Sequence, residues 1–92
     1  MLGDKLITKP FLLTKINEEI KELEDQMIVL QTERGQLRQT KREFRATHSD
    51  LTDPIYVGYE KRAAYCGNRL NVLREKIKKL KAQYVLYSNM NI

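Results

Sequence analysis

Apolar residues, with two basic exceptions, recur along this chain at alternating steps of three and four, in two rows. The first row runs Leu13, Ile16, Ile20, Leu23, Met27, Leu30, Arg34, Leu37, Lys41, Phe44. The second row runs Tyr56, Tyr59, Ala63, Cys66, Leu70, Leu73, Ile77, Leu80, Tyr84, Tyr87. This is the spacing of the a and d positions of a heptad repeat, so the pattern predicts two long amphipathic helices.

The two rows are mirror images about residue 50, because positions paired across that point sum to 100. Phe44 then meets Tyr56 near the fold, and Leu13 meets Tyr87 at the far end. The segment between the rows is short and rich in turn-forming residues, which favours an antiparallel hairpin. The predicted fold class is therefore all-α: an antiparallel two-helix coiled-coil hairpin with an extended N-terminal arm. Dimerisation of two hairpins into a four-helix bundle is an alternative assembly.

Proline and turn residues mark the expected boundaries within a single domain of 92 residues. Residues 1–10 show no period and end at Pro10, so they are expected to form the arm. Asp53 followed by Pro54 is typical of an N-cap with proline at the first helical position. The predicted segments are an arm over 1–10, helix 1 over 11–46, a turn over 47–53, helix 2 over 54–88 and a tail over 89–92.

Charged positions beside the rows support the same register. In each of three pairs, this register places two oppositely charged residues close together: Glu33 with Arg69, Glu24 with Arg74, and Arg38 with Glu60. Exposed ion pairs contribute only about 0–1 kcal/mol, so these pairs would select the register more than stabilise it.

The half of the hairpin nearer the turn carries Arg34 and Lys41 within the first row. We expect their stems to cover the apolar row while their charges reach water. The alternative is that this half is loosely packed because a partner completes it. Cys66, the only cysteine, cannot form an internal disulfide and is expected to be a small buried hydrophobe.

The formal net charge of +5 is concentrated in the half near the turn, because residues 13–30 sum to −3 while residues 33–45 sum to +3. Basic residues interleaved with tyrosines can hold phosphates and stack on bases, so direct RNA or DNA binding is one hypothesis. The candidate nucleic-acid-binding residues are Arg38, Lys41, Arg42, Arg45, Lys61, Arg62 and Arg69.

Further apolar residues lie outside the rows, where a free hairpin would expose them to water. The candidate partner-binding residues are Val29, Tyr65, Val72 and Leu86 at c positions, and Ile28 at the neighbouring b position. A contiguous apolar strip indicates a protein interface, although isolated apolar residues are also normal on surfaces.

No glycine-rich phosphate loop, metal-ligand cluster or nucleophile with a nearby base is visible, so we expect no catalytic, cofactor or metal site and no enzyme activity. The apolar runs are too short to span a membrane and no signal peptide is visible, so a cytoplasmic location is expected. The leading hypothesis is a non-enzymatic interaction module. It would bind a larger protein as an accessory subunit or inhibitor, for example in a machine that processes nucleic acid. Direct nucleic-acid binding and a structural homodimer are the alternatives.

Overall fold

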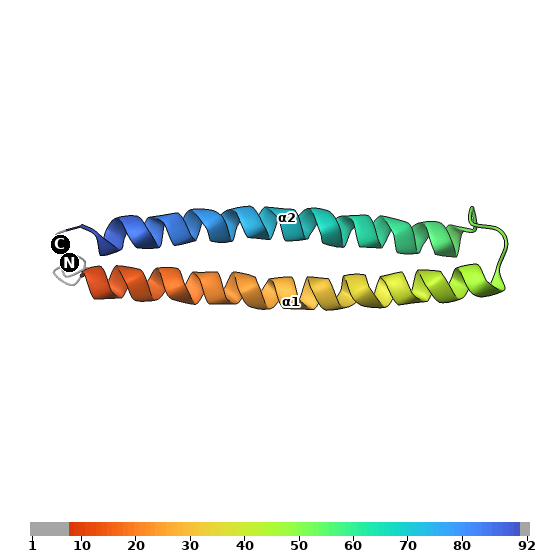
Figure 1. Ribbon diagram of the computed structural model, residues 1–92, viewed down its shortest axis with the longest axis horizontal. Helices are drawn as coiled ribbons and strands as arrows, with labels where there is room; N and C mark the ends of the chain where they lie inside the picture. Colours follow the sequence, from red (N-terminus) through yellow and green to blue (C-terminus); the bar gives the residue numbers. More distant parts are fainter. Residues whose placement is uncertain (1–7, 91–92) are drawn as a thin grey trace, which may run out of the picture.

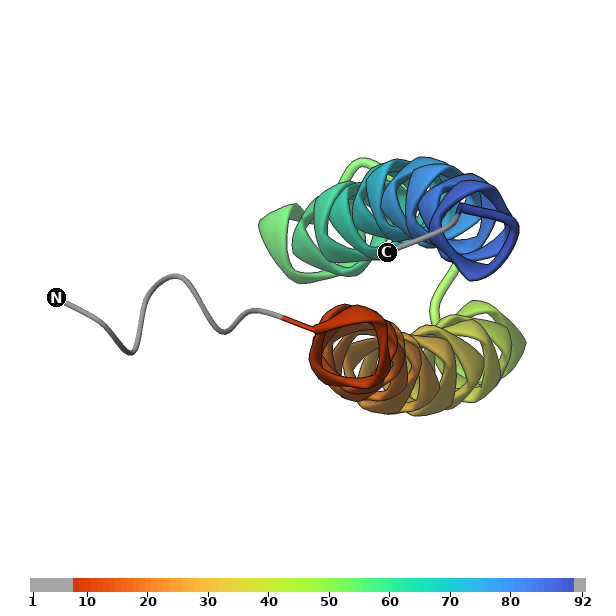
Figure 2. The ribbon, with the colours of Figure 1, turned by 90° about the vertical axis from the view of Figure 1, so that its left-hand side faces the viewer.

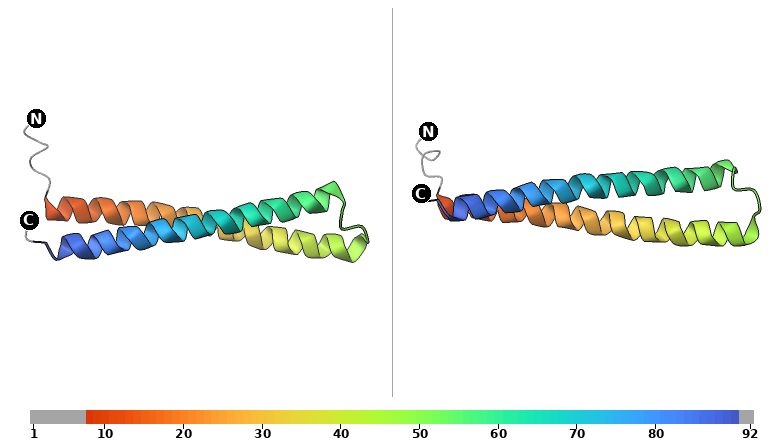
Figure 3. Two further views of the ribbon diagram at one scale, coloured as in Figure 1. Left: turned by 90° about the horizontal axis from the view of Figure 1, so that it is seen from above. Right: turned by 45° about the horizontal axis from the view of Figure 1, so that its top comes forward.

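The computed structural model describes residues 8–90 and consists of two long antiparallel helices joined by a short turn (Figure 1). Helix α1 spans Lys9–Thr47 and helix α2 spans Pro54–Ser88. Seen end-on, the two helices, which make up most of the described range, form a single pair (Figure 2). Seen from above, they cross each other gradually along the rod (Figure 3). The prediction of an all-α helical hairpin is confirmed.

The start of α1 differs from the sequence expectation. The helix begins at Lys9, with Thr8 as its N-cap accepting a hydrogen bond from the Phe11 amide, so Pro10 lies inside the first turn. Proline is tolerated there because the first amides of a helix have no partner within it. The rest of the expected arm, residues 1–7, lies outside the described residues. At its other end α1 continues one residue past the expected 46, to Thr47.

Helix α2 occupies the range that the sequence predicts. The Asp53 carboxylate accepts a hydrogen bond from the Ile55 amide at 2.8 Å, which makes Asp53 the N-cap before Pro54. At the other end Asn89 caps the helix, and its amide bonds to carbonyls of the last turn. The final two residues of the expected tail lie outside the described range.

The core consists of residues from the two apolar rows. Its buried members are Ile16, Ile20, Tyr56, Cys66, Leu70, Leu73 and Ile77. Cys66 and Leu73 are 0% exposed, so Cys66 is the buried hydrophobe that the sequence predicts. Arg34 is exposed above this layer and Lys41 is half-buried. The charge of Arg34 is therefore solvated, whereas the Cys66 side chain is fully buried.

Contacts at the two ends of the rod show that the predicted register holds along its length. At the open end, Lys9 Nζ donates a hydrogen bond to the Met90 carbonyl at 3.1 Å. At the turn end, the rings of Phe44 and Tyr56 lie 5.5 Å apart. Between these ends, Leu23, Met27 and Leu80 pack against the cluster around Ile77.

The predicted ion pairs are wrong in detail. Glu33 pairs with Arg62 instead of Arg69, and within residues 8–90 neither Glu24 nor Arg38 forms an ion pair. The register compares only backbone positions along the helix axes, whereas an arginine side chain is long enough to bind a carboxylate that is not directly opposite it. Arg62, one heptad nearer the turn than Arg69, is the arginine that binds Glu33, while Arg69 lies beside Val29.

Candidate interaction surfaces

Three of the predicted partner-binding residues form a continuous surface across both helices, which we call the apolar strip: Val29, Tyr65 and Val72. Val29 of α1 and Tyr65 of α2 line one hollow of about 280 Å³. Tyr65 and Val72 line a second hollow of about 490 Å³ on α2. The exposed fractions of Val29, Tyr65 and Val72 are 65%, 48% and 44%. Arg69 lines both hollows and so joins them into one surface.

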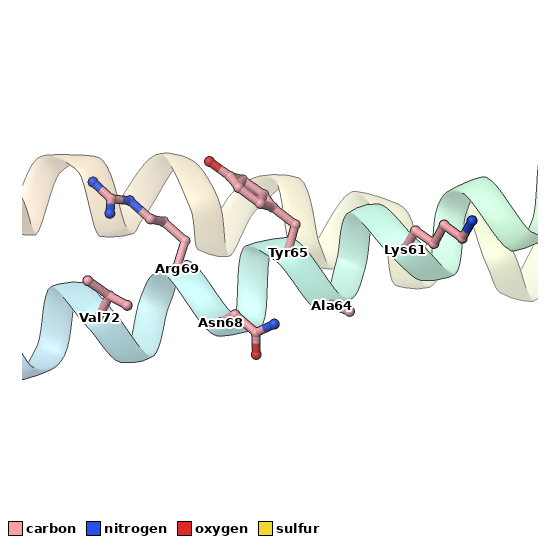
Figure 4. Close-up of a pocket in the computed structure, with 6 residues that line it drawn as sticks. All are labelled: Lys61, Ala64, Tyr65, Asn68, Arg69 and Val72. Atoms are coloured by element: carbon pink, nitrogen blue, oxygen red, sulfur yellow. The ribbon is translucent and has the colours of Figure 1, made fainter.

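Figure 4 shows how the larger hollow is built on α2. Tyr65 and Arg69 point to the same side of the helix, and Ala64 and Asn68 line the same hollow next to them. Lys61 and Val72 lie at the two ends of the hollow. The floor is therefore apolar and the rim carries positive charge.

The Tyr65 ring contacts Arg62, and Arg62 also forms an ion pair with Glu33 of the other helix. The Arg62 guanidinium lies over the Tyr65 ring, 4.6 Å from its centroid, which is a cation–π contact. The same guanidinium donates through Nη2 to Glu33 at 2.9 Å and also through Nε. The hydrogen bond with Arg62 lowers the pKa of Glu33, and the same bond raises the pKa of Arg62. Both partners therefore remain charged at neutral pH.

The other two predicted partner-binding residues lie elsewhere. Ile28 lines a separate hollow of α1 with Asn17 and Lys21, and none of the strip residues contributes to it. Leu86 lies 14 positions beyond Val72, which is roughly 21 Å along a helix. The structure therefore brings together three of the five residues and leaves Ile28 and Leu86 apart from them.

The predicted nucleic-acid-binding residues fall into three separate groups. Arg62 contacts Tyr65, and Lys61 and Arg69 line the hollows of the apolar strip. Arg38 and Lys41 lie together in a different hollow, and Arg42 and Arg45 are exposed further along α1. These residues therefore do not form one patch at the turn.

A second surface, which we call the basic groove, is formed by Arg34, Arg38, Lys41 and Arg74. Arg34, Arg38 and Arg74 line a hollow of about 260 Å³ between the two helices. Arg34, Arg38 and Lys41 line an adjoining hollow of about 140 Å³ with Ala63. The sequence predicted Arg38 and Lys41 as nucleic-acid-binding residues and placed Arg34 in the same basic half, but it assigned Arg74 to an ion pair and so missed that Arg74 joins them in this groove. The detectable signal was that Arg38 and Arg74 both occupy e positions, which share one flank of an antiparallel pair.

Basic and apolar side chains make up most of the lining of both surfaces. Within residues 8–90 no group of three or more histidine, cysteine, aspartate or glutamate side chains is placed to hold a metal ion. Over the same residues, neither helix is apolar enough along its length to cross a membrane. Comparisons with protein-family models, curated proteins and solved structures found no significant match to the chain. The function must therefore be inferred from the two surfaces.

Proposed function

We propose that this protein is a non-enzymatic interaction module, a coiled-coil hairpin that docks through its apolar strip onto a larger protein as an accessory subunit or inhibitor. The observation that carries the proposal is the continuity of Val29, Tyr65 and Val72 across both helices, with two adjoining hollows. A surface that depends on both helices exists only when the hairpin is folded. Docking would therefore require the whole structure and not a single helical peptide.

The strip has the features that concentrate binding energy at protein interfaces. Tyrosine and arginine are the residues that most often dominate such interfaces, and Tyr65 lies between Arg62 and Arg69 along α2. Because the contact with Arg62 restricts the Tyr65 ring, less side-chain freedom is lost on binding.

The rim of the strip indicates the chemistry of the partner. Lys61 and Arg69 surround an apolar floor. A partner helix with one large apolar side chain flanked by carboxylates would complement this surface in both shape and charge. We therefore propose an acidic, amphipathic helix as the docking element of the partner.

Paired substitutions test the proposal. Val29→Asp with Val72→Asp adds two carboxylates to the strip, and Ile28→Asp with Leu86→Asp adds two at other exposed positions outside it. The full chain carrying each pair would be used to recover partners from its native host. We expect the strip pair to lose the partner that the unmodified chain retains, while the control pair keeps it and both remain helical by circular dichroism.

Two results would contradict the proposal. One is a partner retained equally by both variants, which would place its contact on another face. The other is loss of helicity in the strip pair alone, which would assign Val29 and Val72 to the hairpin core. Sedimentation over a range of concentrations distinguishes the homodimer. A mass that doubles with concentration and returns to that of a monomer in the strip pair would identify a second copy of this chain as the occupant.

A further inference from the structure

The basic groove carries an inference that goes beyond docking through the apolar strip. We propose that Arg34, Arg38, Lys41 and Arg74 bind the phosphate backbone of a nucleic-acid duplex. None of these residues lines the hollows of the strip. The groove is therefore a separate surface, and its test is independent of the proposed protein partner.

The spacing of the cations suits a chain of phosphates. Arg34, Arg38 and Lys41 follow one another at steps of four and three along α1, which correspond to about 6 Å and 4.5 Å of rise. Arg74 reaches the same hollow from α2. Positive charge thus lines the groove from both helices.

Small residues create the space between these cations. Gly35 and Ala63 line the two hollows, and a Cβ atom added at Gly35 would have no neighbour within 4 Å. At Gly67 an added Cβ atom would lie 3.7 Å from the Arg34 guanidinium carbon, an ordinary contact distance, which shows that the Arg34 side chain reaches across to α2. A phosphate oxygen could therefore approach the guanidinium groups without displacing another side chain.

The charges of the groove are not neutralised by the hairpin itself. Across the described range, 8–90, no carboxylate forms an ion pair with any of the four residues. Guanidinium groups donate two parallel hydrogen bonds to a phosphate, a geometry that an ammonium group cannot reproduce. Three arginines and one lysine at this site thus suit an anion that offers two oxygens, a phosphate or a carboxylate.

The lining of the groove favours a duplex backbone over two other polyanions. No aromatic side chain lines either hollow, so the unstacked bases of a single strand would have no platform there. The large apolar residue in the lining, Leu70, is 1% exposed, so an acidic protein helix would find no apolar anchor. A duplex presents its phosphates on the outside while its bases remain paired. It therefore needs only positive charge from the groove, and no aromatic or apolar contact.

The salt dependence of binding by the full chain tests this inference. The probes are a DNA duplex, the RNA duplex of the same sequence, the separated single strands, and poly-glutamate as a polyanion without phosphate. Four phosphate contacts predict a slope of log K against log salt of about −3.6, which is roughly a hundredfold loss of affinity between 50 and 200 mM salt. The preferred duplex, RNA or DNA, is the one bound more tightly at equal salt.

Two quadruple variants with the same change in net charge make the test specific. One carries Arg34→Gln, Arg38→Gln, Lys41→Gln and Arg74→Gln, and the other carries Lys61→Gln, Arg69→Gln, Lys76→Gln and Lys79→Gln. We expect the groove variant to bind at least thirtyfold more weakly and to flatten the slope by about 3.6. The control variant should retain most of the slope. Circular dichroism of both variants verifies that they fold.

Three results would overturn the inference: equal losses in the two variants, tighter binding of single strands than of either duplex, or binding of poly-glutamate without binding of a duplex. The first would mean that affinity follows net charge and not this site. The second would assign the site to single strands, and the third would assign the groove to an acidic protein. A strip variant that loses its protein partner while it still binds the duplex would show that the two proposals stand independently.

Discussion

Phe44 of α1 and Tyr56 of α2 face each other beside the turn, with ring centroids 5.5 Å apart and planes inclined by 35°. The Phe44 ring also stacks on His48 at 4.0 Å and meets Tyr59 edge-on at 6.3 Å. Aromatic pairs contribute about 0.5–1.5 kcal/mol beyond the area they bury. One end of the hairpin is therefore closed by an aromatic cluster, while its middle depends on aliphatic packing.

Shortening an aliphatic side chain of the core should lower the free energy of unfolding. Leu73 is 0% exposed, so Leu73→Ala removes buried methyl groups and leaves a cavity. We expect the free energy of unfolding to fall by about 2–5 kcal/mol in urea denaturation. Leu86→Ala changes the same residue type at an exposed position and should alter it by less than about 0.5 kcal/mol. Similar losses in both variants would mean that Leu73 is not a core residue.

Two helical glycines should be replaceable with a gain in stability. An added Cβ atom at Gly35 or Gly58 would meet nothing within 4 Å, and neither residue has a positive φ. Gly35→Ala and Gly58→Ala should each stabilise the hairpin by about 0.5–1 kcal/mol, because glycine loses more backbone entropy in a helix than alanine does. Thermal melting of the single variants and the double variant would measure the gains, which should add for sites this far apart. Destabilisation at Gly35 would indicate a close contact there.

The N-cap of α2 should contribute measurably to stability. Asp53 accepts a hydrogen bond from the Ile55 amide at 2.8 Å, so Asp53→Ala leaves that amide without its partner. The expected cost is about 1 kcal/mol. Asp53→Asn retains the accepting oxygen and serves as the control, with little change expected. Equal destabilisation by both substitutions would implicate the charge of Asp53 instead of its cap.

The ion pair between Glu33 and Arg62 predicts a dependence of stability on pH. The hydrogen bond from Arg62 lowers the pKa of Glu33 below its ordinary value of 4.5, so the folded protein binds fewer protons at this site than the unfolded chain. The stabilisation is therefore present above pH 4.5 and is lost as the pH falls through the lowered pKa. Glu33→Gln should melt below the unmodified protein at pH 7, and this difference should shrink in acid. A difference that stays constant with pH would show that the charge of Glu33 has no role.

The heptad rows predicted the hairpin and its register because a single apolar face determines which residues two helices can bury against each other. The a and d assignment of Leu23 and Ile77 already implied that they share the core. The start of α1 was not predictable in the same way, because Pro10 is compatible both with the end of an arm and with a first helical turn.

The surfaces were harder to predict than the core. A heptad position fixes the direction of a side chain around the helix, so Val29, Tyr65 and Val72 were correctly assigned to one flank. It does not show whether two residues of that flank are close along the rod, which is why Leu86 was grouped with residues far from it. The basic groove was predicted only in part: Arg38 and Lys41 are candidate nucleic-acid-binding residues, but the heptad pattern places Arg34 in the core row and does not bring Arg74 to the same surface.

The constant register has a consequence for how the chain folds. Phe44 and Tyr56 are close in sequence, whereas Lys9 and Met90 meet across 81 positions. Contacts near the turn close short loops. Once they have formed, each next pair of core residues along the helices loses little further conformational entropy when it comes into contact. We therefore expect the contacts of the aromatic cluster to form first and the contacts toward the open end of the hairpin to form afterwards. Substitutions near Phe44 should slow folding, whereas those near Ile16 should mainly accelerate unfolding.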